Sequence, residues 1–311
     1  MNHACCILAK VSKNRHLGRF QSMKSSKATV KTSPRQSMST DLAVQSQEAR
    51  SGAAALSSED KPSAAIERKR LIIAGCSVMA VTLAVFINCL ANGWVFDDFA
   101  HALDPPELRS LSNILKLLAH YRPLRDISYA LDFRIWGESA MGFHFTSIVI
   151  HSVNAGLVFL LCHRLLRTLP AAVLAALIFA LHPIQTDSVS YVSGRRDLLF
   201  SMFYLAALNL YLSHYRQPSK KMLWLALACW GLSLMSKEMA ASFPVVVFLW
   251  NYTGEWRRVE GSWLHRFFVS ARTVLKRDVW LYLGMGVVVV AYSYYDVVAQ
   301  RASARASSST F

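Results

Sequence analysis

Two adjacent carboxylates, Asp97 and Asp98, follow directly on a long apolar stretch, in the segment NGWVFDDFAH at residues 92–101. A carboxylate placed beside a substrate hydroxyl can take up its proton as a general base. An acid pair just beyond an apolar helix can equally be a solvated helix end. The other ionisable residues, and the elements that hold them, have to decide between these two interpretations.

Further charged residues stand in short segments between apolar stretches. They are Arg122 in YRPL (residues 121–124), His182, Arg195, Arg196 and Asp197 in LHPIQTDSVSYVSGRRDLLF (residues 181–200), and Lys237 and Glu238 in SKE (residues 236–238). Ionisable groups at such depths usually face a protein interior or a water-filled cavity. Arginine binds phosphate through two parallel hydrogen bonds and stabilises charge on a departing phosphate. With a carboxylate base, this set suits group transfer from a lipid phosphate to an acceptor.

Each of these segments also has a purely structural interpretation. The arginine pair could anchor a helix at the membrane interface, and the Lys237-Glu238 pair could be a hairpin turn whose charges reach the interface. His182 could belong to a turn that ends a helix. The second apolar stretch adds Asn154 and His151, and we expect Asn154 to hydrogen-bond a neighbouring helix, because polar groups in membrane bundles commonly do so. The six cysteines include no C-x-x-C pair and indicate neither a metal site nor a disulfide framework.

The composition is that of a membrane protein. Hydrophobic residues make up 53% of the 311 residues and charged residues only 17%, below the roughly 25% charged residues of soluble domains. The net charge of +15 would suit nucleic acid, but it lies mainly in the first part of the chain and in short loops. Basic loops set the topology of membrane proteins, and no nucleic-acid-binding motif accompanies the charge. The expected partner is therefore the lipid bilayer, with no nucleic acid.

Seven apolar stretches predict an all-α, polytopic helical membrane protein with about seven spans. They lie at residues 71–96, 143–161, 171–181, 198–212, 222–236, 239–250 and 279–298. The first exceeds the ~20 residues needed to cross the hydrocarbon core. Basic residues precede it and Trp94 lies near its end, which places the N terminus in the cytoplasm and the acid pair outside. The third and sixth stretches are short enough for tilted or re-entrant arrangements.

The chain divides into three parts. Residues 1–66 are predicted to be a disordered, basic, Ser-rich tail, residues 67–300 a helical transmembrane domain, and residues 301–311 a polar C-terminal tail. The outer loop at residues 97–142 is predicted to form two short amphipathic helices, PPELRSLSNILKLLAHY and RPLRDISYALDFRIWG. Such helices lie flat in the membrane interface, so we expect them to roof a cavity above the acid pair.

Five motifs in a fixed order carry a family resemblance. They are FDDF (residues 96–99), YRPL (121–124), FHFTSIVIHSVNAGL (143–157), FALHPIQTDSVSYVSGRRDLLF (179–200) and SKEMAASFP (236–244). Together they resemble the membrane portion of the transmembrane and tetratricopeptide-repeat protein O-mannosyltransferases and their bacterial homologues, which are GT-C glycosyltransferases. YVSGRRDLLF is more similar to the bacterial members, which favours a bacterial inner membrane over the endoplasmic reticulum membrane of a eukaryote.

The resemblance implies a GT-C-like fold and a membrane-embedded glycosyltransferase. Such an enzyme moves a sugar, mannose in the first instance, from a polyprenyl- or dolichyl-phosphate donor to an acceptor hydroxyl on the extracytoplasmic face. The acceptor would be protein Ser/Thr or a glycan. GT-C enzymes carry a catalytic acid in the first outer loop, which implies that Asp97 or Asp98 is the base and that the other orients it or binds a divalent cation. The donor phosphate would be held by Arg196, Arg195 and Arg122, and the cavity wall completed by His182, Asp197, Lys237 and Glu238.

Two alternatives remain open beside the enzyme. Family members continue into a tetratricopeptide array, whereas this sequence shows no ~34-residue repeat, so a non-catalytic membrane scaffold or a truncated remnant is the first alternative. A small transporter is the second. It would need charges across the whole bilayer, whereas the sequence places them on one side, which favours the other two readings.

Overall fold

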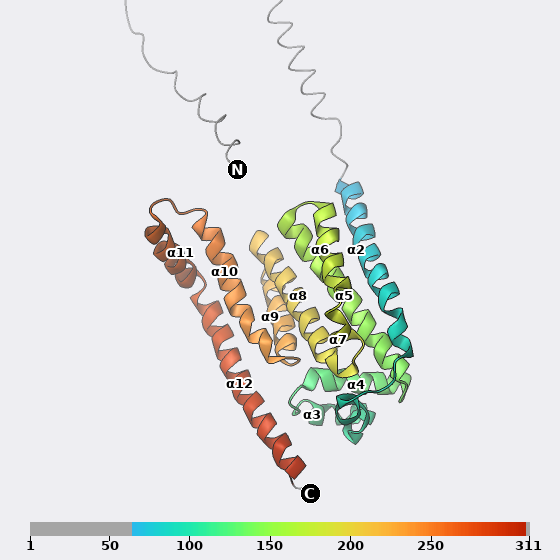
Figure 1. The fold of residues 1–311 in the computed structure, drawn as a ribbon. Coiled ribbons are helices and arrows are strands. Elements are labelled where there is room, and N and C mark those ends of the chain that lie inside the picture. The colour runs from blue at the N-terminus through green and yellow to red at the C-terminus, as the bar shows by residue number, and fades with distance from the viewer. Residues whose placement is uncertain (1–63, 309–311) are drawn as a thin grey trace, which may run out of the picture. The chain divides into compact units, whose positions relative to one another are not determined.

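A computed structural model describes residues 64–308, and all regular secondary structure in that range is helical (Figure 1). The longer helices are α2 (Ala64–Phe86), α5 (Ala140–Leu166), α8 (Arg195–Arg216) and α12 (Val279–Ser308). The shorter ones are α3 (Ile114–Leu117), α4 (Pro123–Trp136), α6 (Leu169–Leu181), α7 (Gln185–Val189), α9 (Lys220–Leu234), α10 (Phe243–Trp256) and α11 (Trp263–Arg277). The prediction of an all-α polytopic membrane protein is confirmed.

Each apolar stretch predicted as a span contains a helix, but the helices differ in length. Four stretches are long and apolar enough to cross a membrane, namely Ala65–Ala91, Ala140–Leu166, Val192–Arg216 and Val279–Arg301. α6, α9 and α10 have 13, 15 and 14 residues, fewer than the ~20 that a perpendicular span needs. The predicted disordered tail lies outside the described residues, except that residues 64–66 begin α2. Likewise α12 continues through residue 308 of the predicted polar C-terminal tail.

Small residues let the bundle helices approach closely. On α6, Ala172, Ala176 and Ala180 recur every four residues and are fully buried, so they form one stripe that packs against α5 and α2. On α5, Gly156 faces Met79 of α2, and a Cβ added there would lie 3.0 Å from the methionine sulfur. α5 therefore contacts α2, α6 and α8 and forms the centre of the bundle.

Polar groups fix the register of the bundle as well. The Asn154 side chain donates to the Leu198 carbonyl of α8 over 3.0 Å, which confirms the packing role expected for it. The ring nitrogen Nε2 of His151 lies 2.9 Å from the Ala180 carbonyl of α6. Both side chains thus satisfy backbone groups of neighbouring helices.

The first outer loop lies across one end of the bundle (Figure 1), and only its second predicted helix forms as one piece. That helix is α4, which begins with Pro123 in its first turn and ends at Gly137, where φ is +62°. The first predicted helix is instead broken into the 3-10 turns η3 (Pro106–Arg109) and η4 (Leu111–Asn113) and the short α3. The Ser110 hydroxyl accepts the Ser112 backbone N–H, a local bond that competes with helix formation.

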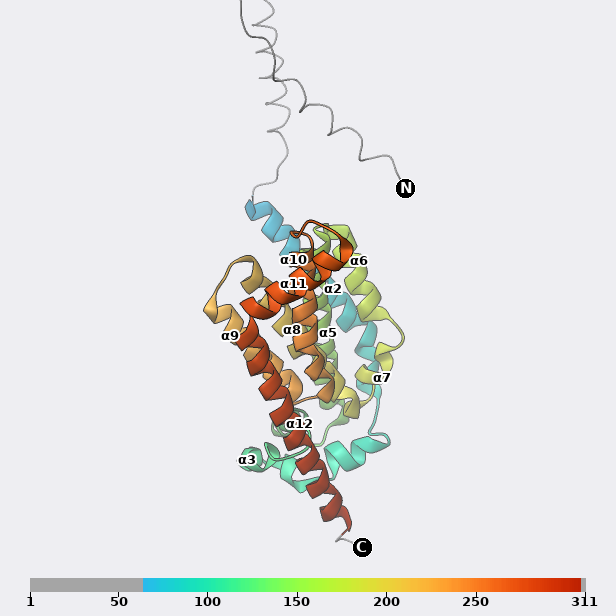
Figure 2. The same cartoon turned by 90° about the vertical axis from the view of Figure 1, so that its left-hand side faces the viewer.

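α11 lies at the opposite end of the bundle, across the ends of α10 and α12 (Figure 2). It was not among the predicted helices. Its N-cap residue Ser262 accepts the His265 backbone N–H through its hydroxyl, as capping serines do. The connections between α5 and α6 and between α8 and α9 lie at this same end, so the first outer loop faces away from them (Figure 1).

Candidate functional site

A tight turn holds the acid pair at the end of the bundle that carries the first outer loop. The turn follows the 3-10 turn η1 (Ile87–Ala91) and passes through Phe96, whose φ is +45°. Asp98 is fully buried. Its Oδ1 accepts the Ser193 N–H over 2.8 Å, and its Oδ2 accepts the Val95 N–H over 3.2 Å. Because both carboxylate oxygens accept backbone N–H groups, Asp98 joins the turn to the start of α8.

Asp97 differs from its neighbour because its side chain is exposed. Its backbone N–H donates to the Tyr191 hydroxyl over 3.2 Å, which holds the turn on the same segment before α8. The chain therefore presents one carboxylate to solvent and uses the other to fix the backbone that carries it.

His101, three residues beyond the acid pair, is affected by the charge of Asp97 and by the charges of two arginines. Loss of hydration lowers the pKa of the His101 imidazole although the side chain still reaches solvent. Arg125 lowers this pKa further, Asp97 opposes the shift, and Arg196 adds a smaller lowering. The charges of the acid turn, of α4 and of the start of α8 therefore all act on the His101 ring.

Arg195 is a structural residue of the bundle end. Its side chain is 0% exposed and forms a 2.5 Å ion pair with Asp132 of α4. It also donates to the Phe143 carbonyl over 2.6 Å and to the Ser147 hydroxyl over 3.3 Å, and it lies over the ring of Tyr129 at 4.9 Å. A guanidinium that ties α4, α5 and α8 together in this way does not reach an open surface.

Arg196, by contrast, keeps free donor capacity. Its side chain is 34% exposed, its ion pair with Asp197 is long at 3.6 Å, and its Nε has no hydrogen-bond partner in the described structure. Asp197 pairs more closely with Lys237, which precedes the 3-10 turn η6 (Glu238–Ser242). Of the arginine pair, Arg196 is therefore the one that can bind a ligand phosphate.

Arg122 connects the outer loop to η6. It lies 3.5 Å from the half-exposed Glu238 carboxylate, and its guanidinium stacks on the Tyr121 ring at 4.7 Å. A backbone bond from Leu124 N–H to the Met235 carbonyl, 3.3 Å long, joins the same two segments. The segments predicted to contribute site residues thus meet at one end of the bundle.

His182 is the candidate residue with a purely local contact in the described structure. Its Nδ1 accepts the Ile184 N–H over 3.2 Å, directly after α6 ends. This bond corresponds to the turn-forming interpretation of His182. Within residues 64–308, no hydrogen bond or ion pair joins the His182 side chain to the acid turn or to the arginines.

A second polar cluster braces the loop. His120 Nδ1 lies 2.9 Å from Asp126 Oδ2, and Arg125 donates to the other oxygen over 2.7 Å. The Tyr295 hydroxyl of α12 reaches the His120 carbonyl over 2.6 Å. α12 therefore contacts the loop directly, beside the candidate site.

The His120–Asp126 contact predicts a pH dependence of stability. The hydrogen bond to Asp126 raises the pKa of His120, against an opposing effect of burial. Its contribution to stability is therefore fully present below about pH 6.5 and is lost as the pH rises through the raised folded-state pKa. We expect the thermal midpoint of the detergent-solubilised chain to fall between about pH 6 and about pH 8, and His120→Gln to remove part of that fall.

His265→Gln serves as the matched control, because it changes an exposed histidine at the other end of the bundle. It should leave the pH profile of the wild type unchanged. An unaltered profile for His120→Gln would contradict the assignment.

Sequence reasoning missed the residues that position the site. Asp132 pairs with Arg195, Tyr191 accepts the Asp97 N–H and Ser193 donates to Asp98. None of the three was predicted to position the site, although Tyr191 lies in the polar motif at residues 181–200. Gly194 was missed too, although a glycine before the arginine pair is a signal of close packing. A Cβ there would lie 2.8 Å from the Ser188 backbone, so only glycine lets α7 and the start of α8 approach this closely.

The acid turn has the carboxylates but not the ligand number of a typical metal site. No group of three or more His, Cys, Asp or Glu side chains within residues 64–308 is arranged to hold a metal ion. An exposed carboxylate can accept a proton, and a partly free arginine at the same end of the bundle can hold a phosphate.

Comparisons with known proteins find similar sequences among protein O-mannosyl-transferases. The human protein O-mannosyl-transferase TMTC3 is 30% identical over 168 residues, covering 49% of this chain and 18% of that protein. The Drosophila melanogaster protein O-mannosyl-transferase Tmtc1 is 31% identical over 194 residues, covering 57% of this chain and 22% of that protein. The chain thus spans about a fifth of the length of these two relatives. No solved structure matches it.

A protein family also matches over residues 123–295, which is more than half of the 311-residue chain. It is described as dolichyl-phosphate-mannose-protein mannosyltransferase. The matched segment contains both arginines and the Lys237-Glu238 turn and begins after the acid pair. The chain is a membrane protein and belongs to the dolichyl-phosphate-mannose-protein mannosyltransferase family.

Proposed function

We propose that this chain is a glycosyltransferase that moves mannose from a dolichyl- or polyprenyl-phosphate donor to a hydroxyl of a protein acceptor. The observation that carries the proposal is the acid turn. An exposed Asp97 is held by a buried Asp98 against the segment that leads into Arg196. Membership of the family supports the sugar and the donor class, and the names of the relatives support a protein acceptor.

The proposed roles follow from exposure and pairing. Asp97 accepts the proton of the acceptor hydroxyl as the new bond forms between that oxygen and the sugar C1. The bond between C1 and the donor phosphate oxygen breaks, and the lipid phosphate leaves with the electron pair. Arg196 stabilises the charge that develops on this phosphate, with Arg122 as a second donor at the same end. Arg195 holds α8 against α4 and α5 and does not contact the donor.

The proposal assigns Asp98 to positioning rather than to metal binding. Both of its oxygens accept backbone N–H groups, which leaves Asp97 as the free carboxylate of the pair. A divalent cation at Asp97 and Asp98 would have to displace these bonds. Transfer that persists in a chelator would support the base mechanism, and transfer restored only by added Mn²⁺ or Mg²⁺ would assign the pair to a cation.

The experiment is a transfer assay with the full chain in lipid vesicles. It uses radiolabelled dolichyl-phosphate mannose and a Ser/Thr-rich acceptor peptide, and it measures label bound to the peptide. Transfer to the peptide is the expected result. Label released only as free sugar would contradict the peptide acceptor, and label left entirely on the donor would support the non-catalytic scaffold.

Arg196→Gln is the informative variant in this assay. Loss of one charge-assisted hydrogen bond costs about 1.5–3 kcal/mol, so we expect the KM for the donor to rise about tenfold or more. The thermal midpoint should not change, because Arg196 is partly exposed and weakly paired. Arg134→Gln, an exposed arginine on α4, is the matched control. Equal effects of the two variants would remove Arg196 from the donor site.

A further inference from the structure

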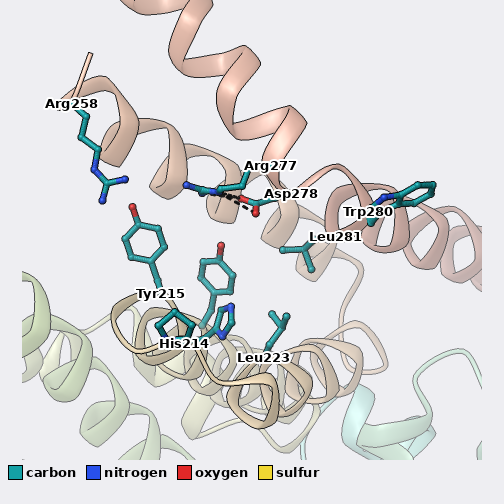
Figure 3. A pocket seen from close by; sticks show the side chains of 10 residues that line it. His214, Tyr215, Leu223, Arg258, Arg277, Asp278, Trp280 and Leu281 are labelled. Atoms are coloured by element: carbon teal, nitrogen blue, oxygen red, sulfur yellow. Dashed lines mark hydrogen bonds and ion pairs between the residues drawn. The ribbon is translucent and has the colours of Figure 1, made fainter. Parts of the chain in front are cut away.

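A polar pocket of about 400 Å³ lies at the end of the bundle opposite the acid turn. It is enclosed by residues near the facing ends of α8, α9, α11 and α12. The side chains of Arg258 and Arg277 and the hydroxyl of Tyr215 point toward one another across it (Figure 3). Two guanidinium groups and a hydroxyl around one space are the donors that a phosphate group requires.

An apolar groove of about 780 Å³ continues from this pocket between α9 and α12. Leu223, Trp280 and Leu281 line both spaces. The groove is otherwise apolar apart from Lys220 and includes Gly231 and Gly284 on facing helices. Pocket and groove together have the form of an amphiphile, with a polar head space joined to an apolar channel.

The arginines of the pocket retain capacity for another anion. Arg258 and Arg277 share the carboxylate of Glu255, at 3.0 Å and 2.8 Å, and Arg277 also pairs with Asp278 at 2.9 Å. Each guanidinium carries five N–H donors, and the Arg258 side chain is 66% exposed. A ligand phosphate can therefore bind without breaking these pairs.

α11 indicates the depth at which this pocket lies in a membrane. Trp263, Leu264 and Phe268 are exposed on it, while Arg266 and Lys276 are among its basic residues and its sequence contains no acid. Amphipathic helices with aromatic and basic residues lie in the headgroup region of a bilayer. The polar pocket is adjacent to this helix, where phospholipid phosphates are found.

We propose that this pocket and groove bind an anionic phospholipid of the leaflet opposite the acid turn. Arg258 and Arg277 hold the phosphate, and an acyl chain lies along the groove over Gly231 and Gly284. The ligand is distinct from the sugar donor, because the site lies at the other end of the bundle. The proposal therefore does not depend on sugar transfer.

The test is a titration of the purified full chain in an uncharged detergent, followed by the thermal midpoint. The probes are phosphatidylglycerol, phosphatidylcholine with the same acyl chains, and glycerol 3-phosphate. Phosphatidylglycerol should raise the midpoint in a saturable manner, as a ligand of the folded state does. The other two should do so only at concentrations at least about tenfold higher, since each lacks the net negative head charge or the acyl chains.

Two variants separate the head and chain contributions. Arg258→Gln removes a phosphate donor, and Gly284→Leu fills the groove. A Cβ at Gly284 meets nothing within 4 Å, so the fold has room for the change. Each should weaken phosphatidylglycerol binding about tenfold or more.

The matched controls are Arg257→Gln, an exposed neighbour outside the pocket, and Gly286→Leu, where an added Cβ also meets nothing. Both should bind as the wild type does. Three outcomes would overturn the proposal: an equal response to phosphatidylcholine, an equal response to glycerol 3-phosphate, or unchanged binding in both Arg258→Gln and Gly284→Leu.

Discussion

Asp97→Asn is expected to lower the rate of sugar transfer by about 10²–10⁴-fold, the contribution of a positioned general base. The asparagine cannot take the proton of the acceptor hydroxyl at neutral pH. The Asp97 side chain is exposed, and the bond to the Tyr191 hydroxyl comes from its backbone N–H. The variant should therefore fold as the wild type does. The assay is mannose transfer to peptide, with the thermal midpoint measured on the same preparation.

The neighbouring substitution should have a different signature. Asp98→Asn leaves either the buried Ser193 N–H or the part-buried Val95 N–H facing an amide N–H instead of a carboxylate oxygen. An unsatisfied buried donor costs about 1–3 kcal/mol, so stability and transfer should fall together. Asp104→Asn changes an exposed acid of the same loop and should do neither. Full transfer by Asp97→Asn with loss in Asp98→Asn would reverse the two roles.

Arg195→Met should destabilise the chain by about 3–5 kcal/mol, because it leaves the buried Asp132 carboxylate without its partner. The double variant Arg195→Met, Asp132→Leu should recover much of this loss, since replacing both members of a buried pair by apolar residues is often neutral. Unfolding midpoints in detergent would measure both effects.

The kinetics of the same variants separate structure from donor binding. Molecules of Arg195→Met that remain folded should show a donor KM close to that of the wild type. Unchanged stability together with a raised donor KM would return Arg195 to the phosphate site proposed for it from the sequence. Arg196→Met gives the comparison at the adjacent position, where the pairing is weak.

The sequence predicted helices from period and length, but not which of two identical neighbours is buried. Arg195 and Arg196 are consecutive on one helix and so point about 100° apart. One side chain enters the bundle and the other does not. The acid pair shows the same division. Arg195 is buried by contacts with α4 and α5, and Asp98 accepts the N–H of Ser193, about 95 residues later. The local sequence pattern carries no information on such distant contacts.

Local chemistry explains the two helices on which prediction and structure differ. The first half of the outer loop has leucines at helical spacing, yet the Ser110 hydroxyl accepts the Ser112 backbone N–H and short 3-10 turns form in place of a helix. α11 is the opposite case, a helix that forms although it was not predicted. Its serine cap and the apolar stripe of Leu264, Phe268 and Leu275 were visible in the sequence, but its basic residues were attributed to a loop that sets topology.

α12 is one continuous helix that contacts both ends of the helical bundle. Trp280 borders the polar pocket at one end, and Tyr295 bonds a carbonyl of the outer loop at the other. The fifteen helical steps from Trp280 to Tyr295 span about 22 Å without a break. A continuous helix tilts as a unit. A shift of the Trp280 end of α12 against α9 would therefore also move its Tyr295 end against the loop that carries His120. The two ends of the bundle are therefore connected through one continuous helix.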